Sequence, residues 1–288
     1  RNSYSKTDHD ATFMHMKEDY MRNGQLKPGY NVNVATCSDF IIGSYISSDR
    51  NDVHTLIPFM EQLQKNYAGR NIGSVVVDSG YESEENYCWF EAHPETELYV
   101  KPSNHEAAKH KKYRTDISRR ENMAYDAQTD TYTCANGKLL QKTQEKKTHT
   151  ASGLKIATSV YECNECDGCP LKEKCIRACG SKKPLEERYK VIYVSKRFAE
   201  QRQAMEAKIS SPKGCLLRVN CSIQAEGNFA YVKQDLDFRR FLLRGNMKVA
   251  AEWLLFSLAL NILHLHHKIQ NRRLGSDLKI PSSFPAGL

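Results

Sequence analysis

The chain has 288 residues and a formal net charge of +8, and its composition is ordinary for a soluble globular protein with one or two domains. It begins at Arg1 without a signal-peptide pattern, so we expect it to be a fragment of a longer protein. Its longest apolar stretch, "VAAEWLLFSLALNIL", is too short for a membrane span and contains Glu252 and Asn261, so we expect no membrane partner.

The first hundred residues alternate between strand and helix patterns. The runs at 30–37 and 40–47, "YNVNVATC" and "FIIGSYIS", predict an antiparallel hairpin. A helix should follow over 48–66, with an Asp or Asn of "DRND" as its cap. The run "SVVV" predicts a strand buried on both faces, "SEENYCWFEAH" a helix capped by Ser83, and "ELYVKP" another strand. This order predicts an α/β fold with a mixed sheet and flanking helices.

The pattern of the sequence changes from about residue 104 onward. "YDAQTDTYTCANGKLL" predicts a β-hairpin with an Asn-Gly turn, and further strands are expected in "LKIATSVYEC" and "YKVIYVS". A helical pattern returns in "NCSIQAEGNFAYVKQDLDFRRF", and "KVAAEWLLFSLALNILHLHHKIQ" predicts a long buried helix. We therefore expect four segments: the first part of a core over 1–103, a basic β-rich insertion over 104–217, the rest of the core over 218–272, and a loose tail over 273–288.

Asp78 stands where the apolar run "SVVV" ends and a helix is about to begin. Open α/β sheets place ligands at such strand ends, so this carboxylate is a candidate site residue. The alternative is a plain turn residue, because Asp before Ser-Gly suits a tight turn. Position alone favours the turn residue.

Basic residues gather in "KHKKYRTDISRR", "KKPLEERYKVIYVSKR" and "FRRFLLRGNMK". Such clusters can attract the phosphates of a nucleic acid, and several of them on one basic chain favour that interpretation. For any single cluster, a solvated surface is the alternative.

Half of the ten cysteines fall in one short span. Cys163, Cys166, Cys169 and Cys175 follow the spacing C-x2-C-x2-C-x5-C, with Cys134 and Cys179 as further candidates. This spacing predicts a structural Zn²⁺ site, with an iron–sulfur cluster or unligated thiols as alternatives. The uneven use of cysteine argues against a secreted disulfide scaffold and indicates a cytoplasmic protein.

Glu226 lies on a predicted helix, and Lys233 follows it two turns later on the same face. Two carboxylates such as Asp78 and Glu226 can share divalent cations that assist the cleavage of a phosphodiester, and a lysine can contact a DNA phosphate. We therefore consider the three residues as one candidate site.

Four motifs, in this order, resemble the DDE transposases of bacterial insertion sequences: "NGQLKPGYNVNVAT" with "SDRNDVHTLIPF", "VVVDSGYESEENYCWF", "YECNECDGCPLKEKC" and "IQAEGNFAYVKQDLDFRRFLLRG". The resemblance implies an RNase H-like core interrupted by a Cys-rich insertion, and Mg²⁺- or Mn²⁺-dependent cleavage and strand transfer at transposon ends. It implies catalytic, metal-binding roles for Asp78 and Glu226, and DNA contacts for Lys233, Arg239 and Arg240. The implied partners are double-stranded DNA, at transposon ends and target, and a second subunit in a homodimer.

The sequence departs from the family pattern in two places. Val219 and Ser222 occupy positions where related signatures carry Tyr and Arg, and no strand ending in Asp precedes "GYNVNVAT". We expect the first core strand and its Asp to lie upstream of Arg1. Two alternatives to a transposase stay open: a DNA-binding remnant without catalysis, and another RNase H-like nuclease.

Overall fold

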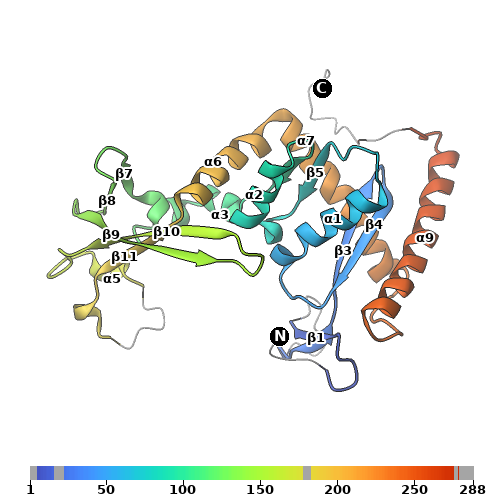
Figure 1. The fold of residues 1–288 in the computed structure, drawn as a ribbon, viewed down its shortest axis with the longest axis horizontal. Helices are drawn as coiled ribbons and strands as arrows, with labels where there is room; N and C mark the ends of the chain where they lie inside the picture. Colours follow the sequence, from blue (N-terminus) through green and yellow to red (C-terminus); the bar gives the residue numbers. More distant parts are fainter. Residues whose placement is uncertain (1–4, 16–22, 178–182, 276–277, 279–288) are drawn as a thin grey trace. The chain divides into compact units, whose positions relative to one another are not determined.

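The structure is a computed structural model that describes residues 5–15, 23–177, 183–275 and 278. The chain separates into two units, of which the first contains Arg1–Lys101 and Ala207–Leu288 and the second contains Pro102–Glu206. The expected insertion over 104–217 therefore extends beyond the second unit at its C-terminal end. Together the units form a mixed α/β structure (Figure 1).

The predicted hairpin is confirmed. Strands β3 (Asn31–Cys37) and β4 (Phe40–Ser47) pair antiparallel through a two-residue turn at Ser38 and Asp39. Both turn residues have positive φ, 56° and 72°, as a tight hairpin turn matching the strand twist requires. Ahead of the hairpin, β1 (Thr12–Met14) pairs with β2 (Lys27–Gly29).

The helix expected over 48–66 is divided. A short 3-10 turn, η1 (Asp52–His54), precedes α1 (Leu56–Asn66), which buries Leu56, Phe59, Met60 and Leu63. Thr55 occupies the N-cap position of α1, so the expected capping by the "DRND" segment is wrong. The Asp52 side chain accepts a hydrogen bond from Asn31 instead, at 2.6 Å.

Strand β5 (Ser74–Val77) runs parallel to β6 (Glu97–Val100). Between them lie a 3-10 turn, η2 (Ser79–Tyr81), and α2 (Glu84–Ala92), whose N-cap Ser83 accepts a hydrogen bond from the Asn86 N–H as predicted. The expected burial of β5 on both faces is wrong, because its three valines are only half-buried. A single mixed sheet is also absent from the described residues: β3–β4 and β5–β6 are separate pairs, since no strand bridges them.

The second unit contains a five-stranded antiparallel sheet in the order β11-β10-β9-β8-β7. Its strands are β7 (Ala124–Asp126), β8 (Thr131–Thr133), β9 (Leu139–His149), β10 (Lys155–Cys163) and β11 (Lys190–Val194). Its helical elements are α3 (His105–Lys109), α4 (Lys111–Arg114), η3 (Arg120–Asn122), α5 (Lys172–Cys175), η4 (Leu185–Glu187) and the start of α6 (Lys196–Ser210). Leu140, Tyr161, Ile192 and Val194 form its core with Met123, Tyr132, Cys163 and Cys166.

The helical pattern after Ser211 is not a regular α-helix. It divides into α7 (Pro212–Cys221), a π turn η5 (Ser222–Glu226), α8 (Gly227–Ala230) and a second π turn η6 (Tyr231–Asp235). The π turns change the angular position of every later residue, so Val232 is buried while Ile223 and Leu236 are exposed.

Helix α9 (Asn246–Gln270) packs against β4. Trp253 and Leu260 enter the core, and the Asn261 side chain both donates to and accepts from the backbone of Ile41 at 2.8 Å. The expectation of burial all round is wrong, since residues such as Leu254 and Leu258 are exposed on its other side. Among the described residues, α9 alone is long and apolar enough to cross a membrane by length and composition.

Two acidic side chains near the first described residues hold the start of α9. Asp10 accepts a hydrogen bond from the Asn246 N–H at the start of α9, and Asp8 accepts one from the Tyr30 hydroxyl. These two carboxylates are therefore engaged in holding α9. Most of the expected loose tail lies outside the described residues.

Candidate functional site

Asp78 lies at the exposed end of β5, directly after the strand's last valine. Its Oδ1 accepts a hydrogen bond from the Gly80 N–H at 2.6 Å, which closes the turn η2. The carboxylate is thus a turn-forming group, as the plain alternative predicted. A carboxylate has two oxygens and about four acceptor positions, so this single hydrogen bond leaves capacity for a cation.

A second carboxylate lies beside it. A Cβ atom on Gly80 would lie 2.9 Å from Oδ2 of Asp52 and 3.0 Å from Oδ1 of Asp78. The two acidic side chains therefore reach the same point from η1 and η2. The sequence alone did not single out Asp52, which was only one of the Asp and Asn residues of "DRND" considered as helix caps.

Buried polar groups hold this corner of the first unit. Asn33 on β3 is 2% exposed, and its Oδ1 accepts hydrogen bonds from the Tyr81 hydroxyl at 2.6 Å and from the Thr55 hydroxyl at 2.7 Å. Asn31, two positions earlier on the same face of β3, donates to Asp52. Burial and the negative charges of Asp52 and Asp78 raise the pKa of Tyr81, so its hydroxyl remains a donor.

Asn86 on α2 connects the two turns directly. Its side-chain NH₂ group donates to the Val53 carbonyl at 3.0 Å and to the Tyr81 carbonyl at 2.7 Å. Val53 belongs to η1 and Tyr81 to η2, so one buried amide fixes the separation of the turns that carry Asp52 and Asp78. The position of the two carboxylates is therefore set by the hydrogen-bonded interior.

Glu226 approaches the same strand from the helical segment. Cys221, at the end of α7, points its thiol toward the Val76 carbonyl of β5, with an Sγ to O distance of 3.6 Å. Burial raises the pKa of the Cys221 thiol to about 11, and the negative charges of Asp78 and Glu226 add to the shift. Both carboxylates are therefore near this thiol, although they are far apart in the sequence. Glu226 is exposed and accepts a hydrogen bond from the Ser222 hydroxyl at 3.0 Å.

The three predicted DNA contacts are exposed but not equivalent. Lys233 lies on the second π turn with its Nζ 5.6 Å from the centre of the Phe229 ring. Arg239 forms an ion pair with Asp237 at 2.5 Å, which offsets part of its charge. Arg240 is exposed. Glu226 ends the first π turn and Lys233 lies in the second, so the α-helical spacing on which their expected alignment depended is not regular between them.

Across residues 5–15, 23–177, 183–275 and 278, no group of three or more His, Cys, Asp or Glu side chains is arranged to hold a metal ion. Asp52, Asp78 and Glu226 therefore do not form a complete three-carboxylate centre. The chemistry of the donors nevertheless fits Mg²⁺, which is bound through one or two carboxylates and retains several waters. Asp52 and Asp78 supply such a pair.

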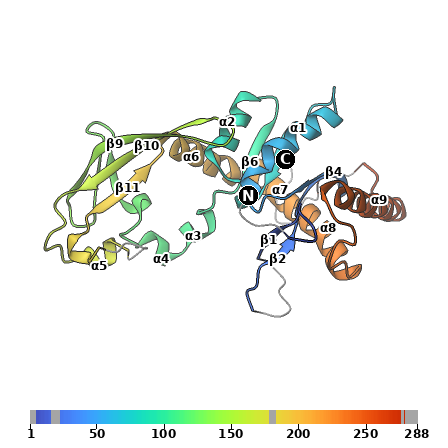
Figure 2. The same cartoon turned by 60° about the horizontal axis from the view of Figure 1, so that its bottom comes forward.

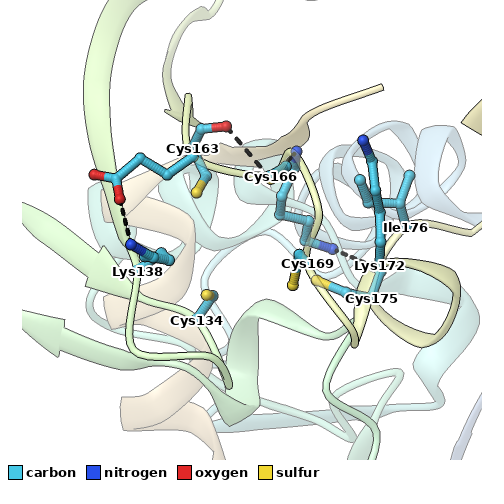
Figure 3. Close-up of a pocket in the computed structure, with 10 residues that line it drawn as sticks. Cys134, Lys138, Cys163, Cys166, Cys169, Lys172, Cys175 and Ile176 are labelled. Carbon is cyan, nitrogen blue, oxygen red and sulfur yellow. Dashed lines mark hydrogen bonds and ion pairs between the residues drawn. The ribbon is translucent and has the colours of Figure 1, made fainter. Parts of the chain in front are cut away.

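Five cysteines line a small cavity of about 20 Å³ in the second unit (Figure 3). They come from three segments: Cys134 from the turn after β8, Cys163 to Cys169 from the end of β10 and its loop, and Cys175 from α5. Cys134 was a possible addition to the predicted set and lies in it, while Cys179 lies outside the described residues. The four predicted cysteines are thus brought together, but around a cavity and not in a metal-binding arrangement.

Charged side chains stand around the buried thiols. Burial raises the pKa of Cys163 to about 11 and also raises that of Cys175. The Lys190 N–H points to the Cys166 sulfur at 3.4 Å, and the Lys190 Nζ donates to the Cys175 carbonyl at 3.1 Å. Lys138, Lys172 and Lys190 line the cavity together with Glu165, which pairs with Lys138 at 2.5 Å, so part of the positive charge near the sulfurs is already neutralised.

Comparison with known proteins gives one match. Residues 133–266 match the family model described as a transposase DDE domain. The matched range includes Cys134, the cysteines from Cys163 to Cys175, Glu226 and Lys233, and it does not reach Asp78. No curated protein and no solved structure matches the chain. The match implies a transposase-related function and suggests a polynucleotidyl transferase.

Proposed function

We propose that this chain, whose residues 133–266 match a transposase DDE domain, belongs to a DDE transposase of a bacterial insertion sequence and serves DNA cleavage and strand transfer at transposon ends. The observation that carries the proposal is the contact of the Cys221 thiol with the Val76 carbonyl of β5, which brings the segment that contains Glu226 beside the strand that ends at Asp78. In this proposal, the first unit is the RNase H-like core and the second unit is its Cys-rich insertion.

Asp78 and Glu226 are the proposed catalytic carboxylates, and they would hold Mg²⁺ or Mn²⁺ together with Asp52, whose carboxylate lies beside that of Asp78. When bound, such a cation supplies positive charge that stabilises the attacking and leaving oxygens of a phosphodiester. The chain's own part is to fix the carboxylates: Gly80 orients Asp78 through its N–H, and Ser222 orients Glu226 through its hydroxyl. Lys233 and Arg240, both exposed, would contact the DNA backbone, with Arg239 as a further contact.

The direct test is to measure Mn²⁺ binding by the purified chain from the signal of free Mn²⁺ in electron paramagnetic resonance. Asp78→Asn and Glu226→Gln should each weaken binding, whereas Glu61→Gln, which removes an exposed carboxylate from α1, should not. Mn²⁺-dependent nicking of supercoiled DNA is the second readout. Equal Mn²⁺ affinity in Asp78→Asn and wild type would reject the catalytic assignment.

A second candidate function is DNA binding without catalysis. It is favoured by the finding that, in the described part of the chain, no three acidic side chains are arranged to hold a metal. Salt-sensitive binding of double-stranded DNA with no metal-dependent nicking would support this candidate over the first. Equal nicking of unrelated DNA and of RNA–DNA hybrids would instead support another RNase H-like nuclease.

We also propose that Cys163, Cys166, Cys169 and Cys175 hold a structural Zn²⁺, with Cys134 as an alternative ligand. The support is the common cavity of the five thiols and the three lysines around it. A structural zinc would stabilise a small unit with few core residues. Elemental analysis should find zinc in the wild type and in Cys37→Ser, whose cysteine is exposed, but not in Cys175→Ser. Absence of both zinc and iron from freshly purified wild type would overturn this proposal.

The proposed partners are the DNA of transposon ends and target, and a second copy of the chain. Analytical ultracentrifugation with and without DNA would establish whether the dimer forms. A monomer in both conditions would exclude it for this chain.

A further inference from the structure

Strands β9 and β10 extend past the rest of their sheet. β10 pairs with β9 from Lys155 to Glu162 but with β11 only from Ser159 to Cys163. The residues from Lys146 to His149 and from Lys155 to Thr158 therefore form a two-stranded ribbon with no third strand (Figures 1 and 2). We call residues 146–158 the ribbon.

The ribbon carries only positive charge. It contains three lysines and one histidine, and no Asp or Glu. Alternation along paired strands places Lys147, His149, Lys155 and Ala157 on one face, and all four are exposed. None of the basic clusters expected from the sequence includes this segment.

The tip of the ribbon is preorganised by its own hydrogen bonds. Thr150 N–H donates to the Leu154 carbonyl at 2.9 Å, and the Thr150 hydroxyl accepts from the Leu154 N–H at 3.1 Å. Gly153 has a φ of +91°, a left-handed conformation that favours glycine. The tip of the ribbon therefore has a defined conformation before a partner binds. Binding would cost the ribbon little conformational entropy.

Positive and aromatic groups continue from the ribbon onto the sheet. The Lys146 Nζ lies 5.2 Å from the centre of the Tyr193 ring, and Tyr193 on β11 is 60% exposed. Tyr193 also lines a cavity of about 430 Å³ together with Arg120 and Arg202. Lys146 pairs with Thr158 on the opposite face of the ribbon from Lys147 and Lys155, so this second positive surface lies on the other face of the sheet.

Exposed lysines also protect edge strands against pairing with other chains, which is the simplest account of this ribbon. That role does not require the absence of acids, because charges of either sign at an edge discourage pairing. The geometry and the charge together point to a partner. A two-stranded ribbon fits the major groove of B-form DNA, which is about 12 Å wide, and its lysines then face the phosphates.

We infer that the ribbon binds double-stranded DNA by entering the major groove, with Lys147 and Lys155 as phosphate contacts. This inference rests on the proposed DNA-directed function and names the surface that function would use.

The test is the salt dependence of DNA binding by the full chain, measured with a fluorescent duplex. Lys147→Gln/Lys155→Gln removes two positive charges from the ribbon. Lys6→Gln/Lys65→Gln removes two charges from exposed sites in the first unit, outside the basic clusters, and serves as the matched control. The ribbon variant should bind about tenfold more weakly at low salt, and its slope of log Kd against log salt should be shallower by about 2. Thermal melting should show both variants folded.

The outcomes are distinguishable. Loss of affinity and slope in the ribbon variant but not in the control supports the inference. Wild-type affinity in the ribbon variant, or an equal loss in the control, overturns it and leaves the proposed DNA-directed function intact. If the wild type fails to bind DNA even at low salt, both fail. A duplex whose major groove is occupied by methyl green should also bind more weakly; unchanged binding would overturn the assignment to that groove.

Discussion

The carboxylates of Asp52 and Asp78 reach the same point, the position that a Cβ atom on Gly80 would occupy. Their nearest oxygens lie 2.9 and 3.0 Å from that position. One carboxylate comes from the turn before α1 and the other from the turn after β5. The pairing makes Gly80 a sensitive position, because a methyl group there must displace at least one of the two acids.

Gly80→Ala should therefore weaken the binding of Mn²⁺. Contacts under 3.0 Å require movement, and the Asp52 side chain is the group that can move. We expect a decrease in Mn²⁺ affinity of about tenfold, similar to other changes next to metal ligands. Gly73→Ala is the matched control, since a Cβ there would meet no atom within 4 Å. Wild-type affinity in Gly80→Ala would show that the two carboxylates do not share a cation.

Asn86→Ala should destabilise the first unit. The change removes two hydrogen bonds and leaves the buried carbonyls of Val53 and Tyr81 without this donor. We expect a loss of about 2 kcal/mol in the free energy of unfolding, measured by urea denaturation. Asn66→Ala, at the exposed end of α1, should change it by less than about 0.5 kcal/mol. A similar small effect for both variants would mean that Asn86 does not connect the two turns.

The second unit should become less stable at acidic pH because Asp130 becomes protonated. Its side chain accepts hydrogen bonds from Lys196 at 2.8 Å and Tyr161 at 2.6 Å, and the ion pair with Lys196 is the main cause that lowers the Asp130 pKa to about 2. Because the folded pKa lies below the unfolded value near 4, the stabilisation is fully present above about pH 4 and is lost as the pH falls through about 2.

Asp130→Asn should remove this contribution. Its free energy of unfolding should depend less on pH between 4 and 2 than that of the wild type. Asn also tolerates the positive φ of 53° at this position, so the backbone should not change. Parallel pH profiles for the two proteins would contradict the assignment.

Substitution of two adjacent residues on α9 should change the free energy of unfolding by very different amounts. Trp253 is 4% exposed and packs with Phe229 and Phe241, whereas Leu254 is 57% exposed. Trp253→Ala should cost about 3–5 kcal/mol of unfolding free energy, because it opens a cavity in the core. Leu254→Ala should change it by no more than about 0.5 kcal/mol. A large cost for Leu254→Ala would indicate that another chain covers this face.

Local chemistry in the sequence determined the elements. The alternation of 30–47 specified the β3–β4 hairpin, and Ser83 with the acids behind it specified the start of α2, because these patterns act over a few residues. The sequence also predicted that Asp78 follows the end of a strand and that the cysteines come together. Each depends on residues that are close together along the chain.

Tertiary structure alone decided how these pieces meet. The sequence predicted a helix cap among the Asp and Asn residues of "DRND", which include Asp52, and a regular helix around Glu226. The structure places Asp52 beside Asp78 through Asn31 and Asn86, and it introduces π turns around Glu226. In the structure, β3–β4 and β5–β6 are separate pairs where one sheet was expected, and one side of α9 is exposed. Buried hydrogen bonds and packing between distant segments cause these differences, and neither is encoded in any short stretch of the chain.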